Sequence, residues 1–214
     1  MPTFAASSAA SSGITNGYAT LAELKARLDI PSGTTSWDAV LEACITSASR
    51  FIDNETHRAF YATTATKYYT ADDHWTLFIL DDILSVTTLK TVSSEAAGTR
   101  TYGYTWSATD YDLEPYDGPP YSRIAMNPTG LYSFPLTRRG VEVTGSFGYN
   151  ATGSHPQPIN EACLRQASRL FERNKAPLGM IGDGQISQAT RYSDRDPDVM
   201  VLLAPYRRME LVGA

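Results

Sequence analysis

The sequence is poor in the features that mark membrane proteins and disulfide scaffolds. No apolar run approaches the ~20 residues that a membrane-spanning helix needs. Two cysteines in 214 residues are too few for a disulfide framework. Cys44 and Cys163 both lie in helical apolar patterns, which favours reduced core residues over a bridge or a nucleophile. The Ala/Ser-rich start, residues 1–13, lacks a basic segment and a continuous apolar stretch, so it predicts a flexible arm and not a secretory signal.

Positive charge is also scarce. The chain has 18 Lys and Arg residues against 23 Asp and Glu residues, which gives a formal net charge of −5. A dedicated nucleic-acid binder usually draws its affinity from basic side chains that release counterions from phosphates. The charge balance therefore argues against such a binder, although it is compatible with DNA that is repelled as it passes nearby.

Nucleotide-binding signatures are absent as well. The stretch VTGSFGYNATG, residues 143–153, places Gly145 and Gly148 between a strand-like run and a helix-like run, as in a phosphate-binding loop. Such a loop needs a lysine at the start of its helix, and the next lysine is Lys175. We therefore interpret the stretch as the end of a strand, with a bend at the two glycines, followed by an extended entry into a helix.

Metal-binding and catalytic patterns are equally incomplete. The stretch DYDLEPYDG alternates Asp110, Asp112 and Glu114 as in a calcium-binding loop, but Pro115 occupies the position that needs a turning glycine. The few histidines form no recognisable motif with their neighbours. They are His57, His74 and His155. We expect no catalytic, cofactor-binding or metal-ligating residue, and hence no enzyme.

Four segments have the periodicity of helices. In YATLAELKARLDI, Thr20 and Glu23 have the spacing of a capping box. A second helix is predicted to start at Ser36, and a third is predicted to have Asn160 as its cap. A last short helix is predicted to have Asp196 as its cap, just before a proline.

The segment from 64 to 154 consists instead of short runs rich in Thr, Tyr, Val and Ile. Asp81-Asp82 is predicted as a turn between two of these runs, and LYSFPL (131–136) as a strand. Because no helices alternate with the strands, a doubly wound nucleotide-binding fold is not expected. The predicted fold class is α+β: a small bundle of about four helices with a large antiparallel β-rich insertion between the second and third long helices.

This prediction divides the chain into four parts. They are a flexible N-terminal arm (1–17), a helical core (18–63 and 155–175), the β-rich insertion (64–154), and a flexible connection with a short helix and a C-terminal arm (176–214). Gly179, Gly182 and Gly184 in the connection are predicted hinge residues.

Arg165, Arg169 and Arg173 lie four residues apart along the third predicted helix. They could face phosphates. Acidic neighbours such as Glu161 and Glu172 favour a surface of ion pairs instead.

Five segments occur in a familiar order: YATLAELKARLDI, ASRFIDNETHRAF, GVEVTGSFGY, PQPINEACLRQASRLFERN and RDPDVMVLLAPYRR. This order resembles the head-to-tail connector proteins (adaptor or head-completion proteins) of tailed bacteriophages. The resemblance covers roughly residues 18–60 and 140–208. It rests on the order and the general residue pattern of the segments, and not on a catalytic motif. The insertion is long for the smaller members of the family.

The resemblance implies a structural protein without a cofactor. Members of the family are assembled in the host cytoplasm into the neck of the virion, as a ring, typically twelve-fold, beneath the portal protein. The ring prolongs the DNA channel without sequence-specific binding, and it offers a docking surface for the tail. The positions that match the portal-binding arm of the family lie after the glycine-rich connection, notably Tyr206, Arg207, Arg208, Met209 and Leu211. The hinge glycines would let the last helix swing away from its own core, so that its apolar face could bind a neighbouring subunit or the portal. This face consists of Val199, Val201, Leu202 and Leu203.

Two alternatives remain open. One is another neck protein or a tail-completion protein. The other is a small hydrolase or a carbohydrate-binding module on the β-rich insertion, where Trp75, Trp106 and many tyrosines could stack on sugars. Aromatic residues in strands more often belong to the core, which favours the connector.

Overall fold

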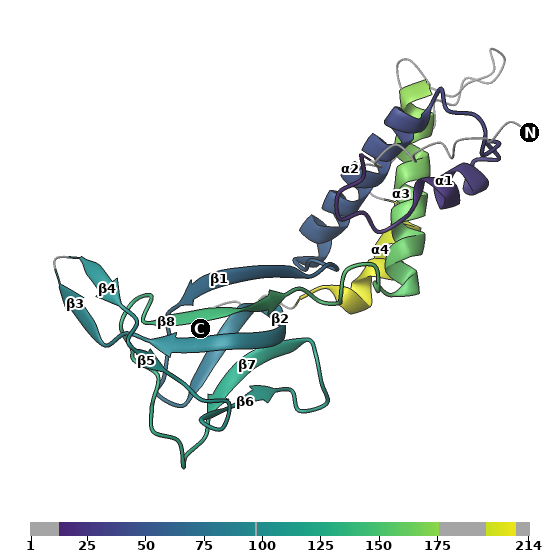
Figure 1. Ribbon diagram of the computed structural model, residues 1–214. Helices are drawn as coiled ribbons and strands as arrows, with labels where there is room; N and C mark the ends of the chain where they lie inside the picture. Colours follow the sequence, from purple (N-terminus) through teal and green to yellow (C-terminus); the bar gives the residue numbers. More distant parts are fainter. Residues whose placement is uncertain (1–12, 97, 176–195, 209–214) are drawn as a thin grey trace, which may run out of the picture. The chain divides into compact units, whose positions relative to one another are not determined.

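The computed structural model describes residues 13–96, 98–175 and 196–208. The chain divides into two compact units: residues 1–57 with 156–214 form a helical unit, and residues 58–155 form a β-rich unit. Two helices precede the strands and two follow them (Figure 1). The fold is therefore α+β with an antiparallel β insertion between the second and third helices, which confirms the predicted class. The predicted N-terminal arm lies mostly outside the described residues.

The described part of the helical unit contains four α-helices and one turn of 3-10 helix. They are α1 (Leu21–Arg27), α2 (Asp38–Thr56), α3 (Gln157–Lys175), α4 (Pro197–Leu203) and η2 (Ala204–Tyr206). In the described segments, no helix combines the length and the apolar character that crossing a bilayer would require.

Two helix starts follow the predicted capping chemistry. The Thr20 side chain accepts a hydrogen bond from the Glu23 backbone N–H at 3.2 Å, and the Glu23 carboxylate accepts one from the Thr20 backbone N–H at 2.7 Å. This is the expected capping box. At α4, the Asp196 side chain accepts from the Asp198 backbone N–H at 2.9 Å, as predicted.

The other two starts differ from the prediction. Helix α2 begins at Asp38, after Trp37, whose side chain makes no capping hydrogen bond. Helix α3 begins at Gln157, so Asn160 lies inside its first turn and is not its cap. Pro158 is tolerated in this first turn, because the first backbone N–H groups of a helix have no partner within the helix. The Asn160 amide donates instead to the carbonyl of Tyr18 at 3.0 Å, which joins α3 to the segment before α1.

The cysteines belong to the core of the helical unit. Both are free and buried, as predicted. Burial raises the pKa of the Cys163 thiol to about 11 and also raises that of Cys44. Both thiols are therefore protonated and unreactive near neutral pH.

A buried lysine anchors the loop between α1 and α2. Only 5% of Lys25 is exposed. Its ammonium lies 2.5 Å from a carboxylate oxygen of Asp38, and it donates to the carbonyl of Thr34 at 2.8 Å. These contacts compensate the cost of removing the charge from water, and they fix the start of α2 against α1.

The β-rich unit contains eight described strands. They are β1 (Thr63–Tyr69), β2 (Thr76–Thr91), β3 (Ser94–Ala96), β4 (Thr99–Thr101), β5 (Tyr104–Thr105), β6 (Tyr111–Glu114), β7 (Tyr121–Met126) and β8 (Val141–Phe147). The main sheet has the order β1-β8-β2-β7-β6, with β5 paired to β2, and β3 pairs with β4 separately. All pairs are antiparallel.

The strand boundaries correct three predictions. Asp81 and Asp82 are not a turn, because they lie inside the 16-residue strand β2. Asp82 is buried there and its carboxylate lies 2.6 Å from the guanidinium of Arg58. The run 131–136 forms no strand, although Phe134 within it is fully buried in the core. Strand β7 was not predicted, because Pro119 and Pro120 precede it and its sequence, YSRIAM, does not alternate regularly between apolar and polar residues.

The two glycines of VTGSFGYNATG have different roles. Gly148 alone has a positive φ, +140°, so only it supplies the predicted bend. Gly145 lies within β8, where a Cβ atom would be 2.1 Å from the carbonyl oxygen of Ser85 on β2. Gly145 therefore permits the close approach of two central strands.

We expect Gly145→Ala to destabilise the β-rich unit by about 3 kcal/mol or more, because backbone atoms would have to move to admit the methyl group. Chemical denaturation followed by circular dichroism would measure the change. Gly33→Ala is the control, since no atom lies within 4 Å of its added Cβ. Equal stability of the two variants would contradict the close packing of β8 on β2.

We expect Asp38→Asn to lower the free energy of unfolding by about 2 kcal/mol, less than for a fully buried pair, because the Asp38 side chain is partly exposed. Asp29→Asn makes the same change at an exposed residue of the same loop, where the positive φ of 54° suits asparagine. Thermal unfolding of both variants would test this. A similar loss in both would show that Lys25 does not depend on its carboxylate.

Candidate partner-binding surface

The polar residues that suggested metal or acid-base chemistry have local structural partners. Asp110 accepts from the backbone N–H of Ser107 at 2.7 Å, and Glu114 pairs with Arg123 at 3.1 Å. The His74 ring nitrogen lies 2.8 Å from the carbonyl oxygen of Phe134. Within the described ranges, no group of three His, Cys, Asp or Glu residues could hold a metal ion.

The aromatic residues proposed to stack on sugars do not share one environment. Trp106 is buried and stacks on Phe134, with ring centroids 4.7 Å apart. Trp75 is 60% exposed. The indole of Trp106 is therefore part of the core and is not available to a ligand.

The helical unit offers a different kind of site, because α4 is a short segment that packs on α3 and α2. Two of its apolar side chains, Val199 and Leu203, are fully buried. Leu202 is half-buried, and Val201 is exposed. The structure thus divides the predicted partner-binding residues between the seat of α4, meaning the surface of α3 and α2 that it covers, and the solvent.

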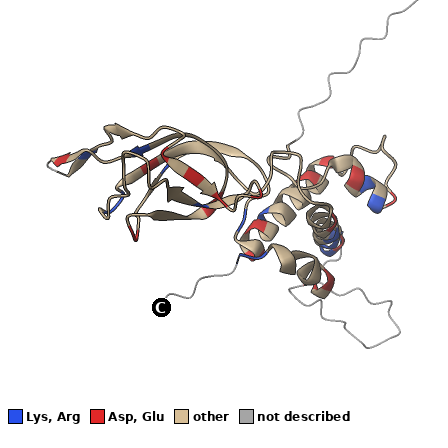
Figure 2. Ribbon diagram, turned by 90° about the horizontal axis from the view of Figure 1, so that it is seen from below, with Lys and Arg blue, Asp and Glu red and all other residues tan. Residues whose placement is uncertain are grey.

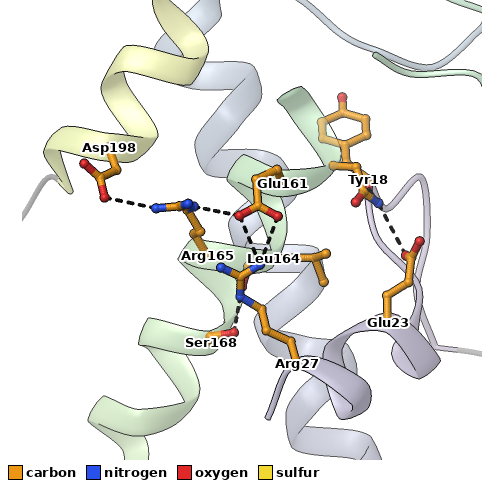
Figure 3. A network of polar contacts seen from close by, with 9 residues as sticks. Tyr18, Glu23, Arg27, Glu161, Leu164, Arg165, Ser168 and Asp198 are labelled. Carbon is orange, nitrogen blue, oxygen red and sulfur yellow. Dashed lines mark hydrogen bonds and ion pairs between the residues drawn. The ribbon is translucent and has the colours of Figure 1, made fainter. Parts of the chain in front are cut away.

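Ion pairs surround this seat. Arg165 on α3 pairs with Asp198 on α4 at 3.0 Å and with Glu161 at 2.7 Å, as Figure 3 shows. Arg169 pairs with Asp196 at 3.6 Å. The predicted arginine face of α3 is therefore engaged by carboxylates at these two positions.

The network continues to α1. Arg27 lies 2.9 Å from Glu161, so this carboxylate is shared by arginines of two helices (Figure 3). The hydrogen bond from Arg27 lowers the pKa of Glu161, and that from Arg165 lowers it further. Glu161 thereby connects α1 to α3, and Arg165 connects α3 to α4.

The chain after α4 returns to the end of α2. Arg207 lies 2.6 Å from Glu55, and the backbone N–H of Arg208 donates to the carbonyl of Thr56 at 2.9 Å. The last bond supplies a partner to one of the carbonyls that a helix end leaves unpaired. Tyr206 and Arg208 are half-buried and Arg207 is exposed. Five further predicted residues lie outside the described residues: Met209, Leu211, Gly179, Gly182 and Gly184.

The β-rich unit carries exposed apolar residues that sequence reasoning did not single out. Phe78 and Leu80 alternate along β2 with the buried Leu77 and Ile79. These four residues form a continuous apolar run, LFIL, and such a run does not reveal which face of the strand is covered. The guanidinium of Arg123 lies 4.5 Å from the ring centre of Phe78.

Charges of both signs occur in each unit (Figure 2). Lys67 pairs with Asp81 and Lys90 with Glu142 in the β-rich unit. Basic side chains paired in this way carry less net attraction for phosphates than free ones.

We expect Glu161→Gln to lower the free energy of unfolding at pH 7 by about 0.5–1 kcal/mol, because the ion pairs are partly exposed. The fold lowers the pKa of Glu161, so the ionised carboxylate stabilises the fold fully at pH values above 4.5, the ordinary pKa of a glutamate. This contribution is lost as the pH falls through the lowered pKa. Thermal unfolding at pH 7 and pH 3 would measure it. The control is Glu172→Gln, at an exposed position of α3, which should be as stable as the wild type. If Glu161→Gln differed from the wild type by the same amount at both pH values, the role of Glu161 would be refuted.

Chains in three solved structures share the fold. They occur in the neck of an empty GTA particle computed with C6 symmetry, the neck of a native GTA particle computed with C12 symmetry, and the virion of a native gene transfer agent (GTA) particle. The TM-scores are 0.57, 0.56 and 0.59, each at 19% sequence identity. The alignments cover 90%, 91% and 95% of this chain and 91%, 91% and 96% of those chains. No family model and no curated protein matches the sequence.

Proposed function

We propose that this chain is a structural protein of a virion neck, a head-to-tail adaptor. Twelve identical subunits would form a ring beneath the portal protein, extend the DNA channel and provide the surface on which the tail docks. The observation that supports this function is the fold shared with chains of GTA particle necks, over at least 90% of both chains.

The extent of the alignment strengthens the proposal. The β-rich unit has 98 of the 214 residues, so neither unit alone could contain an alignment that covers 90% of the chain, and the alignment must include parts of both. A small common motif would instead align within one unit. One of the matched necks was computed with C12 symmetry, which supports a ring of twelve copies.

The charge of the chain suits a channel protein. DNA must slide through the ring without sticking, and a net charge of −5 provides no general attraction for phosphates. The proposed role needs no cofactor and no chemical reaction. The protein would act in the virion neck after assembly in the host cytoplasm.

The C-terminal segment is the proposed contact with the portal or a neighbouring subunit. Arg207 is exposed and Tyr206 and Arg208 are half-buried, so these side chains can meet a partner while α4 stays on its seat. Val199 and Leu203 could do so only after α4 has left it. Leu202, Met209 and Leu211 complete the proposed set, with Gly179, Gly182 and Gly184 as the hinge.

We expect the purified chain to form rings, alone or on addition of the portal protein from the same particle. Native mass spectrometry and electron microscopy would detect a twelve-fold ring coaxial with the portal. A chain truncated after residue 190 should lose portal binding while its β-rich unit stays folded, because the proposed contact residues are removed.

Two results would contradict the proposal. A chain that remains monomeric and does not bind the portal cannot be the adaptor. Portal binding that survives the truncation would exclude the C-terminal segment as the contact. Binding to tail components alone would favour another neck or tail-completion protein.

A further inference from the structure

The connection to α4 is much longer than its seat requires. Asp196 lies 3.6 Å from Arg169, which is six residues before Lys175, the last residue of α3. At a rise of 1.5 Å per residue, Arg169 and Lys175 are only about 9 Å apart along the axis of α3. Residues 176–195 number 20, and a chain of that length can span up to about 66–72 Å. Helix connections in bundles usually have about 2–8 residues.

The seat is specific but small. Helix α4 has seven residues, too few to be stable alone in water, so it needs a surface to pack on. It buries only Val199 and Leu203 completely. Ion pairs add to this contact, and in one of them the Asp198 side chain is 72% exposed. These contacts make the seat complementary to α4 in charge and in shape. They can be broken while α2 and α3 remain packed on each other.

We propose that α4 is exchanged between neighbouring copies, so that α4 of one copy occupies the seat on α2 and α3 of the next. This inference rests on the proposed ring. The contacts of the exchanged helix are the same as those seen within one chain, including Arg165 with Asp198 and Arg207 with Glu55. The two arrangements therefore differ only in which chain carries the helix.

A ring favours the exchanged arrangement for a geometric reason. Each copy in a head-to-tail ring gives one α4 and receives one, so closure leaves no seat empty and no helix unpaired. In the ring, the seat of the neighbouring copy is held close to each α4, which raises its local concentration. A connection of 20 residues is long enough for α4 to reach that seat. The free chain in solution has no such neighbour, so α4 stays on its own seat.

The exchange can be tested by cross-linking across the seat. In the double variant Arg165→Cys/Asp198→Cys, a short bismaleimide should join α3 to α4 in the assembled ring, and denaturing gels then show which chains are joined. We expect most of the chain to shift from the monomer band to a ladder of covalent multimers. The free chain, treated before assembly, should remain monomeric.

Two controls accompany the experiment. The wild type, whose cysteines are both buried, should not react. Arg27→Cys/Glu161→Cys joins α1 to α3, which are not exchanged, and should give monomers in the ring as well. If the first variant does not assemble, Arg207→Cys/Glu55→Cys reports on the same seat.

The outcomes separate the exchange from the proposed function. Multimers from the seat variants together with monomers from the α1–α3 variant support the exchange. Rings that yield only monomers overturn the exchange and leave the adaptor role intact. Failure of the wild type to form rings, even with the portal, overturns the proposed function and the exchange with it.

Discussion

Both units of the protein depend on the antiparallel pairing of β1 with β8. Thr63 pairs with Phe147 and Tyr69 with Val141, so the two ends of the insertion lie beside each other. The backbone N–H of Tyr149 adds a hydrogen bond of 2.7 Å to the carbonyl of Ala59. Helices α2 and α3 are separated in sequence by the whole insertion. Once β1 and β8 have paired, the loop that must close between these helices contains only the few residues outside the pair, and its entropic cost falls accordingly.

Helix α3, completed by that return of the chain, organises the helical unit. The buried faces of α2 and α3, which contact each other, are mostly apolar, and they also carry the hydrogen-bonded pair Ser49 and Cys163, both fully buried. The contacts of α3 with α1 and α4 depend more on charge, through Glu161 and Arg165. Apolar burial contributes more to the free energy of unfolding than these ion pairs do, because ion pairs that are partly exposed stabilise a fold only slightly. In the proposed exchange, the α2–α3 pair can therefore stay folded while α4 leaves its own seat.

The sequence predicted the parts of this structure that local chemistry decides. The capping box at Thr20, the cap at Asp196 and the fold class follow from spacing alone, and the structure has them. The errors arose where distant residues decide. Asp82 looks like a turn residue, but Arg58 neutralises it inside a strand. The seat of α4 was not predictable for the same reason, since Arg165 finds Asp198 across a long connection.

A neck protein of the proposed kind works through shape and contact surfaces, and this explains why comparisons of sequence and of structure differ here. A catalytic site would restrict the identity of particular side chains, and such residues tend to be recognisable as motifs. A fold that must only close an insertion and present surfaces can change most residues as long as burial and pairing are kept. At 19% identity the neck chains retain the fold. Under the proposed function, the positions that must change together are those proposed to meet a partner, such as the exposed Arg207, because each interface needs complementarity only with its own neighbour.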